Sequence, residues 1–467
     1  MATLIWLGLR AFVFSLILTP IIRDIFRVYD IVDHPDSGRK IHPHPIPRVG
    51  GIAIAISYVL ASFFTPDSQL DGAPLVMRLL PSLSVVFTIG LIDDFVGLRP
   101  WQKLAGQTVA AVMAYWAGVR VLTVGGHATG NWSTFLITIL WLLACTNAFN
   151  LMDGLDGLAA GIGLLSTLTI FIGAAIHHDT ALIIATLPLA GCLLAFLCYN
   201  FNPATIFLGD CGSLLIGFLL GCYGAIWTRK SLTVLSMMAP LMVLSLPLLD
   251  VVLAIFRRFL RSKPIFGADR GHIHHRLIDR GLSPRRVVLV IYGVCGIAAA
   301  FALLQSFTSN RYVALVLAVL FVLIIRMGIR YLGYKEFTLA GRVFRIRTFQ
   351  RVLDAQFAME NFSTALRAAD TPEDCWHVIR QHYSVLGFSA VHFQVNGTSY
   401  REWPPHVTEP EYWTIRIGFS ENGFIELARD FHGDDIHSAI GPLADVLRVA
   451  LTERLGGKPR VQAAGVS

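Results

Sequence analysis

Long apolar stretches alternate with short polar loops from the first residues to about residue 335. A helix needs about 20 apolar residues to cross the hydrocarbon core of a bilayer. By this measure about eleven stretches qualify as membrane spans: 2–22, 49–65, 73–92, 103–118, 132–149, 157–176, 181–199, 212–228, 232–256, 286–305 and 311–333. The pattern predicts an all-α polytopic membrane protein with about 11 transmembrane helices.

Beyond that point the pattern becomes that of a soluble domain. A Thr-Pro-Glu-Asp run at 371–374 is a typical helix start, and residues 388–395 alternate like a strand. Two further strands are expected at 412–419 and 423–431, and a closing helix at 436–455. We therefore expect two domains, 1–335 in the membrane and 336–467 as a small α/β extension. The order of elements in the extension is GAF-like without any sharp motif, and its expected role is regulatory or interactive.

The distribution of Lys and Arg predicts the orientation of the membrane domain. They gather in two loops, residues 23–48 and 257–286, whereas loops of the other parity carry few. Basic loops face the cytoplasm. The N-terminus is then outside, and the extension is cytoplasmic. The polar motifs described below fall in loops on the cytoplasmic side, where nucleotide substrates are available.

Composition and cysteine spacing argue against a soluble globular protein, a nucleic-acid-binding protein, and a disulfide or zinc framework. The chain has 467 residues, of which 54% are hydrophobic and 15% charged, well below the charged share of about a quarter in soluble domains. The net charge of +7 sits mostly in a few loops, so we expect no nucleic acid partner. The seven cysteines show no CxxC spacing, so neither a disulfide framework nor a zinc site is indicated.

Acidic and amide side chains concentrate at the ends of several apolar stretches. Asp93 and Asp94 form an adjacent pair at the end of one stretch, beside hydrocarbon, where two carboxylates call for a cation or a proton-transfer role. Asn150, Asp153 and Asp156 follow another stretch at spacings of three, so one helical face would present all three. Such oxygen ligands suit Mg²⁺.

Two further carboxylates are ambiguous on their own. Asp210 lies between glycines just before an apolar helix, with Asn200 and Asn202 upstream, and a simple helix N-terminal role would explain it. Asp250 lies inside a span, where an intramembrane carboxylate indicates function, although helix packing against a polar partner is equally compatible.

A histidine-rich motif occupies the most basic loop. Arg270, His272, His274 and His275 stand together without partner cysteines or an HExxH pattern. A diphosphate site fits this mixture best, because Arg supplies bidentate donors and His supplies donors or a proton. A metal site and a solvated loop remain the alternatives. Together, these carboxylates, amides, histidines and arginine indicate Mg²⁺–diphosphate chemistry with a lipid partner. They do not identify the sugar or the lipid.

Taken together, the motifs resemble those of the polyprenyl-phosphate N-acetylhexosamine-1-phosphate transferase superfamily, which is glycosyltransferase family 4. The resemblance covers about residues 1–335. It rests on these motifs: Arg39-Lys40-x-His42 with Pro47-x-x-Gly50-Gly51, Asp93-Asp94, Asn147-x-x-Asn150-x-x-Asp153-Gly-x-Asp156-Gly157, Gly209-Asp210-x-Gly-Ser213 and His272-x-His274-His275. The histidine motif is most similar to the WecA-like branch, the undecaprenyl-phosphate GlcNAc-1-phosphate transferases. His44 departs from that branch, where Gly is usual.

The resemblance implies a role for each site residue. Asp210 and Asn150 would bind Mg²⁺, with Mn²⁺ as an alternative ion. Asp153, Asp156, Phe207 and Asn202 would bind the nucleotide. Lys103, Arg270, His272, His274 and His275 would hold the diphosphate and sugar. Asp93 and Asp94 would serve the lipid phosphate as catalytic groups, and Lys40, His42 and Asp250 are left without a definite role.

The implied reaction is Mg²⁺-dependent transfer of an N-acetylhexosamine 1-phosphate, first of all GlcNAc 1-phosphate, from a UDP-sugar to undecaprenyl phosphate. The products would be undecaprenyl diphosphate-sugar and UMP, in the first membrane step of a cell-envelope polysaccharide such as O-antigen. The expected location is the bacterial inner membrane. A homodimer is expected from the resemblance alone. The alternatives are an MraY-like phospho-MurNAc-pentapeptide transferase and a non-enzymatic membrane transporter or sensor.

Overall fold

The computed structural model describes residues 2–32, 45–63, 75–121, 123–124, 127–128, 130–228, 238–260, 271–308, 310–333, 361–384, 386, 388–403, 412–420, 423–430, 447 and 449–452. Three of the predicted site residues, Lys40, His42 and Arg270, lie outside these ranges.

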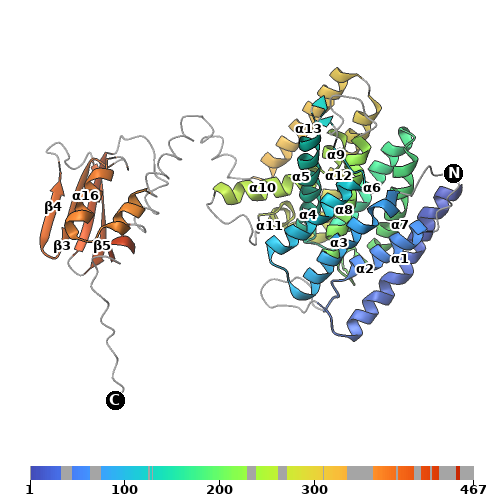
Figure 1. Ribbon diagram of the computed structural model, residues 1–467, viewed down its shortest axis with the longest axis horizontal. Helices are drawn as coiled ribbons and strands as arrows, with labels where there is room; N and C mark the ends of the chain where they lie inside the picture. Colours follow the sequence, from blue (N-terminus) through green and yellow to red (C-terminus); the bar gives the residue numbers. More distant parts are fainter. Residues whose placement is uncertain are drawn as a thin grey trace, which may run out of the picture. The chain divides into compact units, whose positions relative to one another are not determined.

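Helices make up the first part of the chain (Figure 1), as the apolar pattern predicts. They are α1 (Ala2–Val28), α2 (Gly50–Phe63), α3 (Leu75–Val96), α4 (Pro100–Trp116), α5 (Asn131–Met152), α6 (Leu158–Ile176), α7 (Thr180–Asn200), α8 (Gly209–Trp227), α9 (Met238–Val243), α10 (Ser245–Leu260), α11 (Ile273–Asp279), α12 (Pro284–Phe307) and α13 (Arg311–Tyr331). A short pair of strands, β1 (Thr123–Val124) and β2 (His127–Ala128), lies between α4 and α5.

Among the described residues, 8 helices are long and apolar enough to cross a membrane. The expectation of about eleven spans is not confirmed in number. Three of the expected stretches form shorter helices: 49–65 contains α2 with 14 residues, 103–118 overlaps α4 with 17, and 232–256 overlaps α9 and most of α10.

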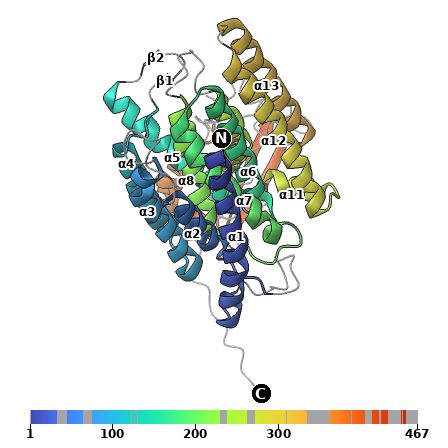
Figure 2. The ribbon, with the colours of Figure 1, turned by 90° about the vertical axis from the view of Figure 1, so that its right-hand side faces the viewer.

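Helix α8 lies at the centre of this bundle (Figure 2) and contacts α2, α3, α5, α6 and α7. Within its most apolar window 94% of the residues are buried, whereas the figure for α13 is 17%. Large apolar side chains on the outer helices, such as Trp6, Leu289 and Leu315, are exposed. An apolar exterior around a buried helix is the arrangement that a lipid environment requires.

Glycines bring the neighbouring helices unusually close to α8. A Cβ added to Gly51 of α2 would lie 2.5 Å from the Cα of Gly212, and one added to Gly90 of α3 would lie 2.6 Å from the Cα of Cys211. Small residues at such positions allow backbones to approach directly. The close contact brings the end of α3, with its two adjacent aspartates, to the first turn of α8.

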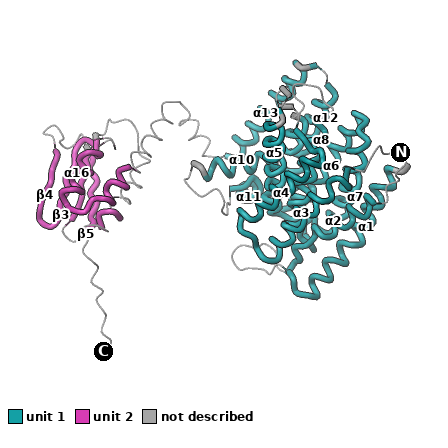
Figure 3. Tube along the Cα trace, viewed as in Figure 1, with its two compact units in different colours: residues 1–334 teal, residues 335–467 magenta. Residues whose placement is uncertain are grey.

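Two compact units divide the chain (Figure 3), Met1–Tyr334 and Lys335–Ser467, next to the boundary expected from composition. In the second unit the described elements are a helix at 361–368, α16 (Pro372–His382), β3 (Ala390–Val395), β4 (Thr398–Glu402), β5 (Tyr412–Ser420) and β6 (Gly423–Asp430). The strands form an antiparallel sheet in the order β4-β3-β6-β5.

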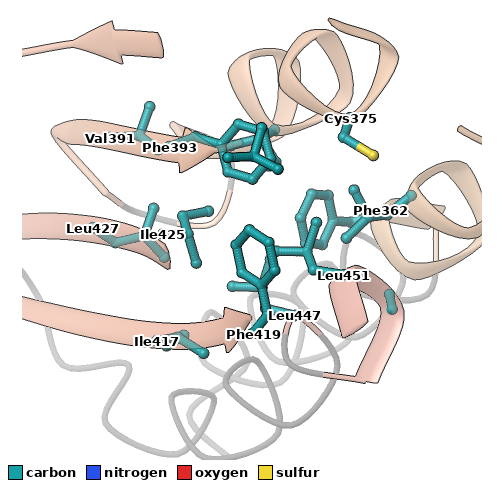
Figure 4. Close-up of a cluster of buried hydrophobic side chains, with 14 of the residues drawn as sticks. Phe362, Cys375, Val391, Phe393, Ile417, Phe419, Ile425, Leu427, Leu447 and Leu451 are labelled. Atoms are coloured by element: carbon teal, nitrogen blue, oxygen red, sulfur yellow. The ribbon is translucent and has the colours of Figure 1, made fainter. Parts of the chain in front are cut away.

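One face of that sheet packs its apolar side chains against the helices. Phe393, Ile425 and Phe419 meet Phe362 and Leu451 in this core (Figure 4). The expected helix start and three expected strands are confirmed. Strand β4 was not expected. Of the closing helix expected at 436–455, the described residues 447 and 449–452 are helical, and the rest lies outside the described ranges. The GAF-like fold stays a prediction.

Candidate active site

The ammonium group of Lys103 lies at the centre of the predicted site. Its Nζ donates a hydrogen bond of 2.7 Å to Asp93 Oδ2 and one of 3.1 Å to Asn150 Oδ1. It also forms an ion pair with Asp210 Oδ2. These four residues come from α4, α3, α5 and α8, so the fold brings together side chains from four separate helices. The convergence of oxygens on one cation is the main feature of the site.

Asn150 and Asp210 also bond to each other. The Nδ2 of Asn150 donates to Asp210 Oδ1 at 2.9 Å and to Ser213 Oγ at 3.0 Å. This orientation turns the Oδ1 of Asn150 toward Lys103. The two predicted metal ligands therefore share one site, and their relative geometry is fixed by hydrogen bonds.

Asp94 supports the site in a different way from Asp93. Its two carboxylate oxygens accept hydrogen bonds from the backbone N–H groups of Asp210, at 2.7 Å, and of Cys211, at 2.9 Å. These are first-turn amides of α8, which have no partner within the helix, and a carboxylate is favoured there. The preceding residue, Gly209, has a φ of +75°, which a residue with a side chain would rarely adopt. Asp94 thus holds the position of Asp210.

The turn after α5 and the loop after α7 form the second part of the site. Asp156 Oδ2 accepts from Asn202 Nδ2 and from the backbone N–H of Ala204, both at 3.0 Å. These bonds join the two segments that carry the predicted nucleotide-binding residues. The backbone N–H of Phe207 donates to the carbonyl of Pro47 at 2.8 Å, and its side chain is half-buried. Burial and the nearby Asp210 carboxylate raise the pKa of Asp153 to about 7.

The histidine motif begins the short helix α11. Asp250 accepts a hydrogen bond from His272 Nδ1 at 2.7 Å, which gives this carboxylate the polar partner that the sequence left open. Its helix, α10, is not among the helices long and apolar enough to cross a membrane, so the expected position of Asp250 inside a span is not confirmed. His274 is buried, and among the described residues its two ring nitrogens have no hydrogen-bond partner. A Cβ on Gly154 would lie 2.6 Å from His274 Nε2, so the histidine motif lies directly against the Asp153–Asp156 turn. Burial and His275 lower the pKa of His274 to about 3.

The donor set fits a hard divalent cation. Among the described residues no group of three His, Cys, Asp or Glu side chains forms a metal site by itself. The set around Lys103 instead combines the carboxylates of Asp93 and Asp210 with the amide oxygen of Asn150. Mg²⁺ favours a few such oxygens and completes its shell with water and phosphate. The ammonium group already shows that these oxygens gather around a positive charge.

Sequence reasoning did not identify several residues that support the site. Ser213 bonds to Asn150, Gln107 pairs with Asn147, and the hydroxyl of Tyr292 donates to the carbonyl of Gly157 at 2.5 Å. Ser213 belongs to the Gly209-Asp210-x-Gly-Ser213 motif, so the sequence did indicate that this segment is functional. Gln107 and Tyr292 lie within apolar helices, and no local pattern indicates their partners.

A bundle of apolar helices that gathers carboxylates, amides, a lysine and histidines at the ends of several helices defines a multi-pass membrane enzyme. Residues 76–228 match the family described as glycosyl transferase family 4.

Three relatives extend that match. A probable undecaprenyl-phosphate N-acetylglucosaminyl 1-phosphate transferase of Bacillus subtilis (strain 168) is 36% identical over 322 residues, covering 67% of this chain and 87% of the relative. A decaprenyl-phosphate N-acetylglucosaminephosphotransferase of Mycobacterium tuberculosis (strain H37Rv) is 36% identical over 351 residues, covering 66% and 84%. A phospho-N-acetylmuramoyl-pentapeptide-transferase of Moorella thermoacetica is 35% identical over 271 residues, covering 54% and 82%. The chain belongs to glycosyl transferase family 4 and is a bacterial multi-pass membrane enzyme.

Proposed function

We propose that this enzyme transfers N-acetylglucosamine 1-phosphate from UDP-N-acetylglucosamine to undecaprenyl phosphate, giving undecaprenyl diphosphate-N-acetylglucosamine and UMP. The observation that carries the proposal is the convergence of Asp93, Asn150 and Asp210 oxygens on the Nζ of Lys103. Two relatives are named for transfer of the same sugar phosphate to polyprenyl phosphates. The product is a lipid-linked sugar of the kind on which a cell-envelope polysaccharide is built.

Mg²⁺ would be held by Asp210 and Asn150, where it would neutralise the diphosphate and stabilise the charge that develops on the departing UMP. Lys103 is within reach of the same oxygens. With those oxygens bound to a metal, the ammonium group of Lys103 would be free to donate to a phosphate oxygen instead. Asp94 keeps Asp210 in place through the first amides of α8.

Asp93 is the group best placed to serve the lipid phosphate. One of its oxygens accepts from the backbone N–H of Leu98 at 2.6 Å and the other from Lys103. Asp93 also lies near the end of α3, a helix long and apolar enough to cross a membrane. A phosphate monoester has a second pKa near 6, so a carboxylate can orient or accept its last proton. The attacking oxygen then displaces UMP in line at the sugar-bearing phosphorus.

The site faces the cytoplasm in this proposal, where UDP-sugars are available. The basic end of α1 supports this orientation, because Arg27 in its last turn donates from Nη2 to the carbonyl of Thr205 at 3.1 Å, within the loop that carries Phe207. The basic end of α10, with Arg257 and Arg258, leads to the histidine motif. Positively charged segments thus lie beside the site residues, as the positive-inside rule predicts for a cytoplasmic face.

UMP release tests the proposal. Purified enzyme is given undecaprenyl phosphate with UDP-N-acetylglucosamine, UDP-N-acetylgalactosamine or UDP-MurNAc-pentapeptide, with Mg²⁺ or with a chelator. We expect Mg²⁺-dependent release from UDP-N-acetylglucosamine, lost in Asp210→Ala. Release only from UDP-MurNAc-pentapeptide would favour the activity for which the Moorella relative is named. Absence of release from every donor, by protein that remains folded, would refute the proposal.

A further inference from the structure

Asp250 is a fully buried carboxylate with 0% exposure in the middle of α10. Its Oδ2 lies 2.7 Å from His272 Nδ1, and its Oδ1 accepts from the backbone N–H of Ile273 at 2.9 Å. A carboxylate in this setting is costly unless its oxygens are satisfied. Both carboxylate oxygens of Asp250 therefore bond to the first residues of α11, His272 and Ile273.

The bond to Nδ1 determines how His272 can act. With Nδ1–H donating to the carboxylate, the second ring nitrogen, Nε2, is left to face a ligand. The ring of His272 is parallel to that of His274, with centroids 5.8 Å apart and an interplanar angle of 4°. His274 lies against Gly154 in the Asp153–Asp156 turn. Holding the ring of His272 in place therefore also helps to hold the histidine motif against that turn.

A second contact from the same helix supports this arrangement. A Cβ on Gly271 would lie 2.6 Å from the Nε of Arg257, so the Arg257 side chain lies along the backbone just before His272. Two side chains of α10 therefore contact the start of the motif. Arg257 lies against Gly271, and Asp250 bonds to His272 and Ile273. A carboxylate that only packed two helices together would not need to bond to a ring nitrogen and the next amide at once.

We propose that Asp250 is a positioning residue, which fixes the tautomer and ring orientation of His272 so that Nε2 faces the diphosphate of the sugar nucleotide. The inference rests on the proposed function, because it takes the donor diphosphate as the ligand of the histidine motif. Asp250 itself touches neither substrate nor metal. It acts through His272, and its effect should disappear when His272 is absent.

The test is a double-mutant cycle of Asp250→Asn and His272→Gln. Asparagine retains an oxygen for the Ile273 amide but presents an amide N–H₂ group to Nδ1, so the variant perturbs the histidine contact selectively. For histidines that bind a metal, loss of the orienting partner typically costs roughly 10- to 100-fold in affinity or activity, and we expect an effect of similar size for a histidine that binds a diphosphate. We expect the KM for the UDP-sugar to rise by about that factor, with the KM for undecaprenyl phosphate unchanged. In the His272→Gln background, Asp250→Asn should change the donor KM by less than about threefold, because coupled residues are not additive.

Calorimetric binding of UDP to the same variants gives a readout that needs no turnover. Asp250→Asn should weaken UDP binding by the same factor, and Val252→Ala, at a position that is 60% exposed on the same helix, should leave it unchanged. If Asp250→Asn does not fold, Asp250→Glu is used in the same cycle. Fully multiplicative effects, an equal rise in both KM values, or unchanged UDP binding would overturn the proposal. A wild-type enzyme that binds UDP but releases no UMP would refute the proposed function instead.

Discussion

Replacing Lys103 with methionine should make the stability of the enzyme strongly dependent on Mg²⁺. The side chains of Lys103, Asp93 and Asp210 are only 14%, 13% and 24% exposed. Methionine has a similar length but no charge, so it leaves two carboxylates facing each other without a cation. In the wild type the ammonium group already bonds to both carboxylates and offsets one of their two negative charges, and a metal ion has to displace it.

Removing one partner of a buried ion pair costs about 3–5 kcal/mol, and the partial exposure of Asp210 places the expected loss at the lower end, about 3 kcal/mol. Bound metal restores stability by mass action, by about 2.7 kcal/mol when its free concentration is 100 times its dissociation constant. Saturating Mg²⁺ should therefore recover most of the loss in Lys103→Met. The wild type should gain less, because part of the binding free energy is used to displace the lysine.

The assay is thermal unfolding of the detergent-purified protein, followed by tryptophan fluorescence, with a chelator or with Mg²⁺. Lys103→Met should unfold at a lower temperature than the wild type in chelator and show a larger Mg²⁺-induced increase. Arg99→Met, which removes a positive charge from an exposed position just before α4, is the matched control and should behave like the wild type. Equal Mg²⁺-induced increases in wild type and Lys103→Met would refute the reasoning.

Three further predictions concern other parts of the chain. Because burial lowers the pKa of His274 to about 3, below the usual 6.5, the unfolded chain binds the extra proton and stability falls as the pH drops below about 6.5. His274→Gln should therefore reduce the loss of unfolding free energy between pH 7 and pH 5 by about 2 kcal/mol, measured by SDS unfolding in mixed micelles. Gly51→Ala should lower the unfolding temperature sharply, because its Cβ would meet the backbone of α8, whereas Gly296→Ala, with open space around it, should not. A chain that ends at residue 360 should retain transfer activity in the UMP assay, because the described site residues all lie in the first unit.

Apolar periodicity predicted most of the membrane unit, because lipid imposes one simple requirement on each helix. It could not predict that α2, α4 and α10 are shorter than the helices that can cross a membrane, since all three are stabilised by contacts with neighbouring helices. Strand β4 was missed because its Thr-Ser-Tyr-Arg-Glu sequence is polar and lies at the edge of the sheet. Its signal was the Asn396-Gly397 turn, where both residues have positive φ.

The candidate site was predictable in its members and less so in their roles. The sequence motifs singled out Asp93, Asn150 and Asp210 as candidate site residues. In the structure all three bond to the Nζ of Lys103. Asp94 looked equivalent to Asp93 because the two are adjacent. Consecutive residues on a helix point in different directions, and only the close approach of α3 to α8 shows that Asp94 bonds to backbone amides. Contacts between distant helices have no local signature.

The movement of one phosphorus atom tests the central claim most directly. The enzyme is incubated with undecaprenyl phosphate, Mg²⁺ and UDP-N-acetylglucosamine labelled with ³²P at the β-phosphate, and the lipid and aqueous phases are separated. Transfer of a sugar 1-phosphate predicts that the label enters the lipid phase in proportion to the UMP released, and that neither occurs with Asp210→Ala. Label that stays in the aqueous phase as UDP while the sugar becomes lipid-linked would contradict the account, because the bond broken would then be the glycosidic one.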